Sequence, residues 1–267
     1  MNDQRSASVM SQLTRFGSEA GLSISPEVLL DPDIVEAFVV RGLPGRAHST
    51  KGTYRSVLSR LAGEGARRPK RRGTPFSAAP APAPYCGAER AELEAIARAQ
   101  PRLERGRSAR VVLAGGIGAG LRPLEIVALR ADDVVSDGNQ VSVKVRAAFE
   151  RLVPLSPPHG ERLAELAALS AGGLLFRPGL VVRDYKNALN DLCCHLDCDP
   201  QATKLSAPRC RASFICDHLA AGTTLSELCA IAGLCEPESL LRYCRHVEGA
   251  PQSKAALRAR ARAESLR

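Results

Sequence analysis

The sequence contains no apolar run that approaches the roughly 20 residues needed to span a bilayer, although 45% of its 267 residues are hydrophobic. Its first residues, MNDQRSASVMSQLTRFG, lack the apolar centre of a secretory signal peptide. The nine cysteines are odd in number and irregularly spaced, which argues against a secreted disulfide framework. These absences predict a cytoplasmic protein.

The sequence also lacks the paired segments that usually form a closed zinc site. Its densest group of metal-ligating residue types is Cys193, Cys194, His195 and Cys198, all within one stretch, DLCCHLDCDP. A closed site normally takes ligand pairs from two separated segments. Thiols packed on a helix are therefore the favoured interpretation, with zinc as the alternative. The cluster of carboxylates and histidines that a metal-dependent nuclease would need is absent as well.

Positive charge exceeds negative charge along the chain. The 37 lysines and arginines outnumber the 28 aspartates and glutamates, which gives a formal net charge of +9. Such a balance favours a polyanionic partner such as nucleic acid. Many basic proteins bind nothing acidic, however, so charge alone leaves the partner open.

Residues 1–63 are predicted to form a helical domain. Apolar residues recur there at spacings of three and four in SVMSQLTRF, SPEVLLDPDIVEAFVV and STKGTYRSVLSRLAGE. In the third stretch, Lys51 and Arg55 lie one four-residue stride apart and share a helix face. Arg60 points away from that pair. Two interpretations stay open: a scattered set of solvated basic residues, or a helix that faces DNA.

The composition changes sharply over residues 64–85. The stretch ARRPKRRGTPFSAAPAPAPYCG contains a run of basic residues and then a proline- and alanine-rich tract. It cannot pack a core, so an extended, semi-rigid linker is predicted. A basic linker suits a protein that wraps a duplex, because phosphate contacts need no fixed fold. The basic residues concerned are Arg67, Arg68, Lys70, Arg71 and Arg72.

Residues 86–250 are predicted to form a second domain, and residues 251–267 a basic C-terminal helix. Helical stretches flank a hairpin-like pair, NQVSVKV and AAFERLVPLSP, in which apolar and polar residues alternate. The glycines of VVLAGGIGAG follow helical sequence with the spacing G-x-G-x-G, which argues against a dinucleotide-binding unit. They predict instead a tight join between two helices, with Pro123 in the first turn of the second. Arg122 then lies at a helix start, where free N–H groups favour a phosphate.

Two stretches resemble the tyrosine recombinases, the phage integrase superfamily. GLRPLEIVALRADDV resembles the first arginine box, with Arg122 as its arginine. LSAPRCRASFICDHLAAGTTLSELCAIAGLCEPESLLRYCRHV resembles the second box and the nucleophile segment. There Arg211 falls on the second arginine, Gly233 on the glycine before the last histidine, and Tyr243 on the nucleophile. The predicted hairpin is similar to the family's hairpin and residues 1–63 to its core-binding domain, so the resemblance covers about residues 8–247.

The resemblance implies a mainly α fold with a small β-sheet, arranged as a two-domain C-shaped clamp on duplex DNA. It implies that Arg122 and Arg211 hold the scissile phosphate, because a guanidinium stays charged and can bind phosphate in a bidentate manner. Tyr243, one of only four tyrosines, would attack that phosphate to give a 3′-phosphotyrosine. No metal or nucleotide cofactor is needed. The likeness further implies a homotetramer on two DNA sites, a C-terminal helix that docks on a neighbour, and room for an accessory DNA-bending protein.

The sequence departs from the family at two positions. Pro208 stands where the family usually has histidine, and Leu234 stands where it usually has histidine or tryptophan. Neither side chain can donate a hydrogen bond. The family's hairpin lysine, which would protonate the leaving 5′-oxygen, falls on Arg146, a poor general acid. Lys144 lies on the same strand face and is the substitute. A DNA-binding repressor or architectural protein that has lost turnover is therefore the alternative function.

Overall fold

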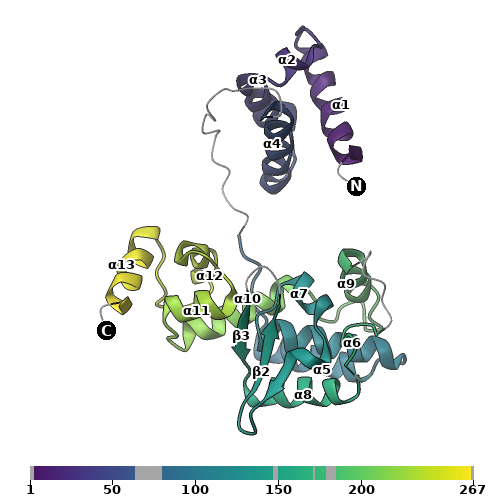
Figure 1. Ribbon diagram of the computed structural model, residues 1–267, viewed down its shortest axis with the longest axis vertical. Coiled ribbons are helices and arrows are strands. Elements are labelled where there is room, and N and C mark those ends of the chain that lie inside the picture. The colour runs from purple at the N-terminus through teal and green to yellow at the C-terminus, as the bar shows by residue number, and fades with distance from the viewer. Residues whose placement is uncertain (1–2, 64–79, 147–149, 171, 179–184, 266–267) are drawn as a thin grey trace. The chain divides into compact units, whose positions relative to one another are not determined.

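The computed structural model describes residues 3–63, 80–146, 150–170, 172–178 and 185–265 (Figure 1). Contacts divide the chain into two units, Met1–Pro80 and Ala81–Arg267. The predicted linker therefore lies mostly outside the described residues, as does its basic run, Arg67, Arg68, Lys70, Arg71 and Arg72. The last linker residues, 81–85, belong to the second unit. The mainly α fold with one small sheet is confirmed, whereas the C-shaped clamp stays a prediction.

The first unit is a small helical body. It consists of α1 (Asp3–Glu19), α2 (Pro26–Leu29), α3 (Pro32–Ala37), a π-helical turn (Phe38–Gly42) and α4 (His48–Gly63). The second predicted stretch is interrupted because Oδ1 of Asp31 accepts from the N–H of Asp33 at 2.9 Å and caps a new helix. Pro32 suits the first turn of that helix. The core of this unit is formed by Val9, Leu13, Leu29, Val35, Phe38, Val39, Leu43, Val57 and Leu58.

The second unit carries the sheet and the remaining helices. In chain order these are α5 (Gly87–Arg98), α6 (Leu103–Leu113), a π-helical turn (Ala114–Gly118), α7 (Pro123–Ala128), a 3-10 turn (Ala131–Asp133), β1 (Val134–Ser136), β2 (Val141–Val145), β3 (Arg151–Pro154), α8 (Pro157–Ala168), α9 (Tyr185–Cys194), α10 (Ala207–Ala220), α11 (Leu225–Ala232), a 3-10 turn (Pro237–Leu240), α12 (Leu241–Cys244) and α13 (Lys254–Ser265). Among the described helices of both units, none is long and apolar enough to cross a membrane.

The three strands form one antiparallel sheet in the order β1-β2-β3. Val143 on β2 pairs with Val134 on one side and Val153 on the other. Val143 and Val153 are fully buried, whereas Lys144, the next residue on β2, is exposed because successive side chains point to opposite faces of the sheet. Helix α8 packs against β1 and β2, and α11 packs against β3. The predicted hairpin is therefore confirmed as β2 and β3.

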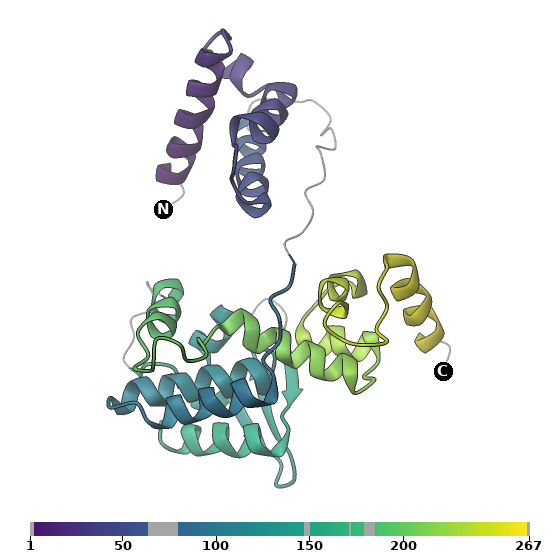
Figure 2. The same ribbon diagram turned by 180° about the vertical axis from the view of Figure 1, so that it is seen from behind.

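Helix α6 and the π-helical turn after it form the centre of the second unit, with α5, α8 and α10 packed around them. Figure 2 shows α5 and α6, both in blue, side by side. A Cβ added to Gly116 would lie 2.5 Å from Cβ of Cys210 on α10, and one added to Gly118 would lie 2.5 Å from Cβ of His159 on α8. These glycines therefore allow α10 and α8 to pack closely on the turn, a role different from the tight join between consecutive helices that the sequence predicts.

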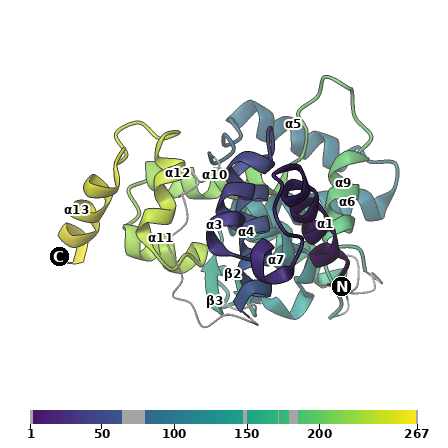
Figure 3. The same ribbon diagram turned by 90° about the horizontal axis from the view of Figure 1, so that it is seen from above.

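Helices α11, α12 and α13 lie together at one end of the second unit (Figure 3). Leu257 of α13 is fully buried, and Nε of Arg258 forms an ion pair of 2.6 Å with Glu238. Oε2 of Glu264 accepts from the N–H of Leu225, the first residue of α11, at 2.7 Å. The C-terminal helix thus packs on α11 of its own chain in this structure, and docking on a neighbour stays a prediction.

We predict that Gly120→Ala destabilises the second unit by about 3 kcal/mol. Gly120 has a φ of 57°, and an added Cβ would lie 2.3 Å from Cδ1 of the buried Phe214. Left-handed strain costs roughly 1–2 kcal/mol for a residue with a side chain, and overpacking adds a further 1–3 kcal/mol or so. Urea unfolding followed by circular dichroism measures the loss.

The matched control is Gly222→Ala. Gly222 has a φ of 78°, and nothing lies within 4 Å of its added Cβ. This variant carries the backbone strain without the overlap, so it should lose only about 1–2 kcal/mol. Equal losses in the two variants would contradict the close approach of Phe214 to Gly120.

Candidate active site

Helix α11 ends in a glycine that leaves three carbonyl oxygens for partners outside the helix. Gly233 has a φ of 63°, in the left-handed region that glycine adopts without strain. Its N–H donates to Ala230 O at 3.1 Å, and the N–H of Leu234 donates to Cys229 O at 2.8 Å, which is the Schellman arrangement. The carbonyls of residues 231–233 therefore lie at the negative pole of the helix dipole.

Three arginines from distant parts of the chain bond to these three carbonyls. Nε of Arg151, on β3, donates to the first at 2.8 Å, and Nη2 of Arg211, on α10, donates to the second at 2.7 Å. Nη2 of Arg122, at the start of α7, donates to the third. A Cβ on Gly233 would lie 2.8 Å from Nη1 of Arg151, so only glycine leaves room for this arrangement.

A buried carboxylate connects two of these arginines. Glu125 accepts from Nη1 and Nη2 of Arg151 at 2.9 and 2.8 Å, and from the backbone N–H of Arg122 at 2.7 Å. The side chains of Arg151 and Glu125 are 7% and 5% exposed. Burial alone would raise the pKa of Glu125, but the bonds from Arg151 and Arg122 outweigh it and hold the pKa below its usual value. The arginine cluster (Arg122, Arg151 and Arg211 with Glu125) therefore carries net positive charge.

Arg211 is the buried arginine of the cluster that interacts electrostatically with the predicted nucleophile. It is 8% exposed, and its Nη1 also donates to Gly120 O, at the bend before α7. Burial lowers the pKa of Arg211, and the nearby charges of Arg122 and Arg151 lower it further, while Tyr243 and Glu125 raise it. The same interactions show that Tyr243 lies within electrostatic reach of the cluster.

Tyr243 lies on the four-residue helix α12 and is 8% exposed. Its carbonyl accepts a weak hydrogen bond from Sγ of Cys216, on α10, at 3.9 Å. The guanidinium carbon of Arg242 lies 5.4 Å from the centre of the tyrosine ring. Within the described residues the hydroxyl of Tyr243 forms no hydrogen bond. The structure thus brings Arg122, Arg211 and Tyr243 into one basic region of the second unit.

Solved structures resemble this chain in fold. The XerH site-specific recombinase bound to its difH substrate, in a pre-cleavage complex, has a TM-score of 0.59 and 15% identity over 92% of this chain and 75% of that one. The Tn1549 transposon integrase in complex with transposon right end DNA has a TM-score of 0.58 and 15% identity over 87% of this chain and 85% of that one. The chain has the tyrosine-recombinase fold. No protein-family model and no curated protein matches it in sequence.

The two basic residues of the hairpin that the sequence analysis names, Lys144 and Arg146, both form ion pairs with carboxylates. Lys144, 49% exposed, forms an ion pair of 3.6 Å with Glu150. Arg146, 56% exposed, bonds to the buried Asp133. Both line a cavity of about 210 Å³ that is also lined by Glu125, so they border the arginine cluster. Their catalytic roles stay predictions.

The two departures from the recombinase pattern each serve the fold. Pro208 is exposed in the first turn of α10, where its missing N–H leaves no helical bond unmade. Leu234 follows the glycine cap of α11 and packs against the core. His218 bonds to Oγ1 of Thr223 at 3.0 Å, and burial lowers its pKa. None of these residues offers a proton donor to the arginine cluster.

The basic residues predicted to contact DNA in the first unit differ in their surroundings. Nζ of Lys51 donates to Val40 O at 3.3 Å, and Nη2 of Arg55 forms an ion pair of 2.8 Å with Glu36. Arg60 is exposed. Lys51 and Arg55 thus make contacts within their own unit, and their binding to DNA stays a prediction.

The structure adds site residues that the sequence analysis did not name. Glu125 and Arg151 form the buried pair behind Arg122, and Arg242 lies directly before Tyr243 with a buried Nε that has no hydrogen-bond partner in the described chain. Glu125 could have been predicted from the sequence, because it follows Arg122 at the three-residue spacing of a capping box.

The alternative of a zinc site concerns the cysteines of the DLCCHLDCDP stretch, which lie outside the arginine cluster. Cys193 and Cys198 are half-buried and Cys194 is exposed. Among the described residues, no group of three or more histidine, cysteine, aspartate or glutamate side chains could hold a metal ion. The thiols are therefore less buried than the favoured interpretation expects.

We predict that Glu125→Gln lowers the free energy of unfolding by about 3 kcal/mol at pH 7, because it leaves the buried charge of Arg151 without its carboxylate. The pKa of Glu125 is lowered in the folded chain relative to about 4.3 in an unfolded chain. Its contribution is thus present above pH 4.3 or so and is lost as the pH falls through the folded pKa. The difference between wild type and variant should shrink there.

Urea unfolding at pH 7 and at a series of lower pH values measures this difference. Glu165→Gln is the matched control, because Glu165 is 62% exposed in a loose pair of 3.9 Å with Arg110. A pH-independent gap between wild type and Glu125→Gln would show that the carboxylate charge does not stabilise the cluster.

Proposed function

We propose that the chain is a site-specific DNA recombinase that cuts and rejoins duplex DNA through a covalent 3′-phosphotyrosine at Tyr243. The observation that carries the proposal is the convergence of Arg122 and Arg211 on adjacent carbonyls at the end of α11, with Tyr243 in electrostatic reach. The recombinase and integrase structures that share the fold are complexes with DNA, which supports duplex DNA as the substrate.

In the proposed reaction, Arg122 and Arg211 bind the non-bridging oxygens of the scissile phosphate and stabilise the charge of the transition state. The phenolic oxygen of Tyr243 attacks phosphorus and loses its proton, while the bond to the 5′-oxygen breaks and that oxygen gains a proton. A 5′-hydroxyl of another strand then attacks the phosphotyrosine and reverses these changes. The phosphate ester is conserved throughout, so rejoining needs no nucleotide cofactor.

Proton transfer in the proposed reaction depends on few side chains. Lys144 is assigned to the leaving 5′-oxygen, because Arg146 cannot release a proton near neutrality. Pro208 and Leu234 provide no further donor. Since a general acid or base typically contributes about 10²–10⁴-fold in rate, we expect slow strand exchange.

The partners in this proposal are duplex DNA and further copies of the chain. Four protomers on two DNA sites, with or without an accessory DNA-bending protein, would provide the strands that are exchanged. The basic residues of the first unit and of the linker, Lys51, Arg55, Arg60, Arg67, Arg68, Lys70, Arg71 and Arg72, would bind phosphates along the duplex.

The alternative is a DNA-binding repressor or architectural protein with the same fold and no turnover. Pro208 and Leu234 favour it, as does the engagement of Arg146 by Asp133. The two proposals differ in one product, because only the recombinase forms a covalent bond to DNA.

We predict that the full chain forms a covalent complex with a nicked duplex from a pool with a randomised centre. The nick lets the cleaved fragment diffuse away, so the phosphotyrosine accumulates and is seen on a denaturing gel. Tyr243→Phe should abolish the band, and Tyr54→Phe, in the first unit, should retain it. A mobility shift without any covalent band would support the alternative.

We further predict that Arg211→Lys slows covalent complex formation by about 10²–10³-fold on the duplex selected in that pool. Lysine keeps the charge but loses the fork that bonds Gly120 O and Ala232 O, and with it the planar group that would bind the scissile phosphate. Arg105→Lys is the matched control, because Arg105 bonds a carbonyl, that of His195, at 2.7 Å on the surface. An equal loss of mobility shift and covalent product in Arg211→Lys would mean that Arg211 only holds the fold.

A further inference from the structure

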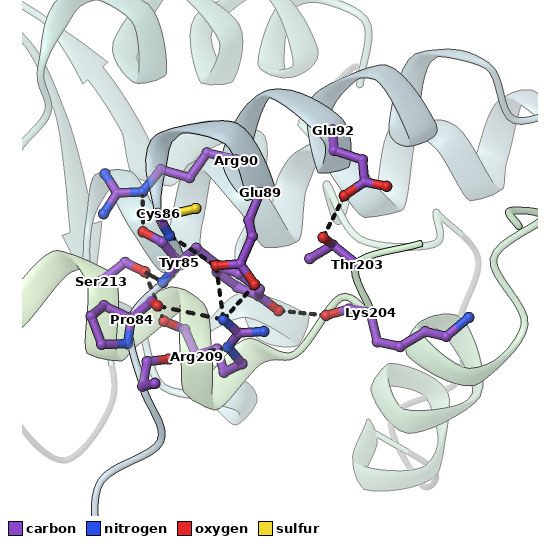
Figure 4. A network of polar contacts seen from close by, with 11 residues as sticks. Pro84, Tyr85, Cys86, Glu89, Arg90, Glu92, Thr203, Lys204, Arg209 and Ser213 are labelled. Atoms are coloured by element: carbon purple, nitrogen blue, oxygen red, sulfur yellow. Dashed lines mark hydrogen bonds and ion pairs between the residues drawn. The ribbon is translucent and has the colours of Figure 1, made fainter. Parts of the chain in front are cut away.

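The first five residues of the second unit, 81–85, are hydrogen-bonded to α10, the helix that carries Arg211. In this strap, defined as residues 81–85, the backbone N–H of Tyr85 donates to Oγ of Ser213 at 2.8 Å. Nε and Nη2 of Arg209 donate to the carbonyls of Ala83 and Pro84 at 3.1 and 3.4 Å. Figure 4 shows these contacts from close by. The strap thus contacts α10 at Arg209 and Ser213, two residues before and two residues after Arg211.

Tyr85 anchors the strap. It is 1% exposed, and its hydroxyl donates to Lys204 O at 2.6 Å. The guanidinium carbon of Arg209 lies 3.9 Å from the centre of its ring, in a cation–π contact, and Arg209 also forms an ion pair of 2.8 Å with Glu89. Nε of Arg90 donates to the carbonyl of Tyr85 at 2.9 Å (Figure 4). A residue placed in a proline- and alanine-rich tract is therefore fixed on every side.

The other end of the strap touches the segment of the predicted nucleophile. Ala81 is 5% exposed, and its carbonyl accepts from Nε2 of His246 at 3.2 Å. His246 lies three residues after Tyr243, just beyond α12. A helix of four residues has few internal bonds, so its position depends on contacts with neighbouring segments.

We propose that the strap is a positioning device and that Tyr85 and His246 are its positioning residues. Through Tyr85 it holds α10 and hence Arg211, and through His246 it holds α12 and hence Tyr243. The second unit begins at Ala81. The position of the nucleophile therefore depends on the hydrogen bonds that the strap makes with α10 and His246. The effect of the strap on catalysis rests on the function proposed above. Its effect on the position of α12 can be measured without catalysis.

The first test compares His246→Ala with His246→Gln in the full chain, on the selected duplex at saturating concentration. Alanine removes the N–H donor to Ala81 O, whereas the amide of glutamine retains one. Because misplacing reacting groups by about 1 Å can cost on the order of 10²-fold in rate, we expect His246→Ala to slow covalent complex formation by roughly 10–100-fold. The duplex affinity in a mobility shift should stay unchanged, and His246→Gln should recover most of the rate.

The matched control is His195→Ala, because His195 also bonds a main-chain carbonyl, that of Asp191 at 2.9 Å, and lies outside the strap. It should react at the wild-type rate. Equal rates for His246→Ala and wild type would overturn the proposal, and so would an equal loss in the alanine and glutamine variants.

The second test is hydrogen exchange of the full chain without DNA. Backbone amides of residues 241–247 should exchange faster in His246→Ala and in Tyr85→Leu than in wild type, while those of the first unit should not change. Tyr85→Phe, which keeps the ring beside Arg209, should lie closer to wild type. Unchanged exchange at residues 241–247 would overturn the strap whatever the activity. A wild type that forms no covalent product would overturn the proposed function, and the exchange data would then still decide the strap.

Discussion

The end of helix α11 is the constraint on which the second unit depends. Its glycine cap leaves three carbonyls, and each is bonded by an arginine from a different element. Since cations stabilise the negative end of a helix dipole, one short helix brings Arg122 and Arg211 together. The buried pair of Glu125 and Arg151 then fixes this arrangement from the sheet side.

The arginine cluster suits the binding of an anion, but the residues around it supply few groups for proton transfer. The arginine cluster has net positive charge and a neighbouring phenol, which suits the attack of a tyrosine on a phosphate. Pro208 and Leu234 complete a helix start and a helix cap instead of supplying donors. In the proposed reaction this geometry favours phosphate binding and nucleophilic attack, and we expect departure of the 5′-oxygen to limit turnover.

The sequence allowed the fold to be predicted because both arginine boxes and Tyr243 lie in recognisable local patterns, and the catalytic roles of Arg122, Arg211 and Tyr243 stay predictions. Arg151 was missed because a polar residue at a strand end is typical of an exposed position. The strap was missed for a different reason: its tract has no periodicity, and its partners lie 128 and 165 residues away. Contacts over such separations leave no local pattern. The shared origin of these failures is that polar side chains were buried by tertiary packing.

In the proposed function, Arg122 and Arg211 hold one phosphate beside residue 243. A crystal structure of the full chain with Tyr243→Phe, bound to the selected duplex, measures this directly. Both guanidinium groups should lie within about 2.7–3.2 Å of non-bridging oxygens of the same phosphate, with the ring of residue 243 next to it. Guanidinium groups bound to different phosphates, or to none, would contradict it.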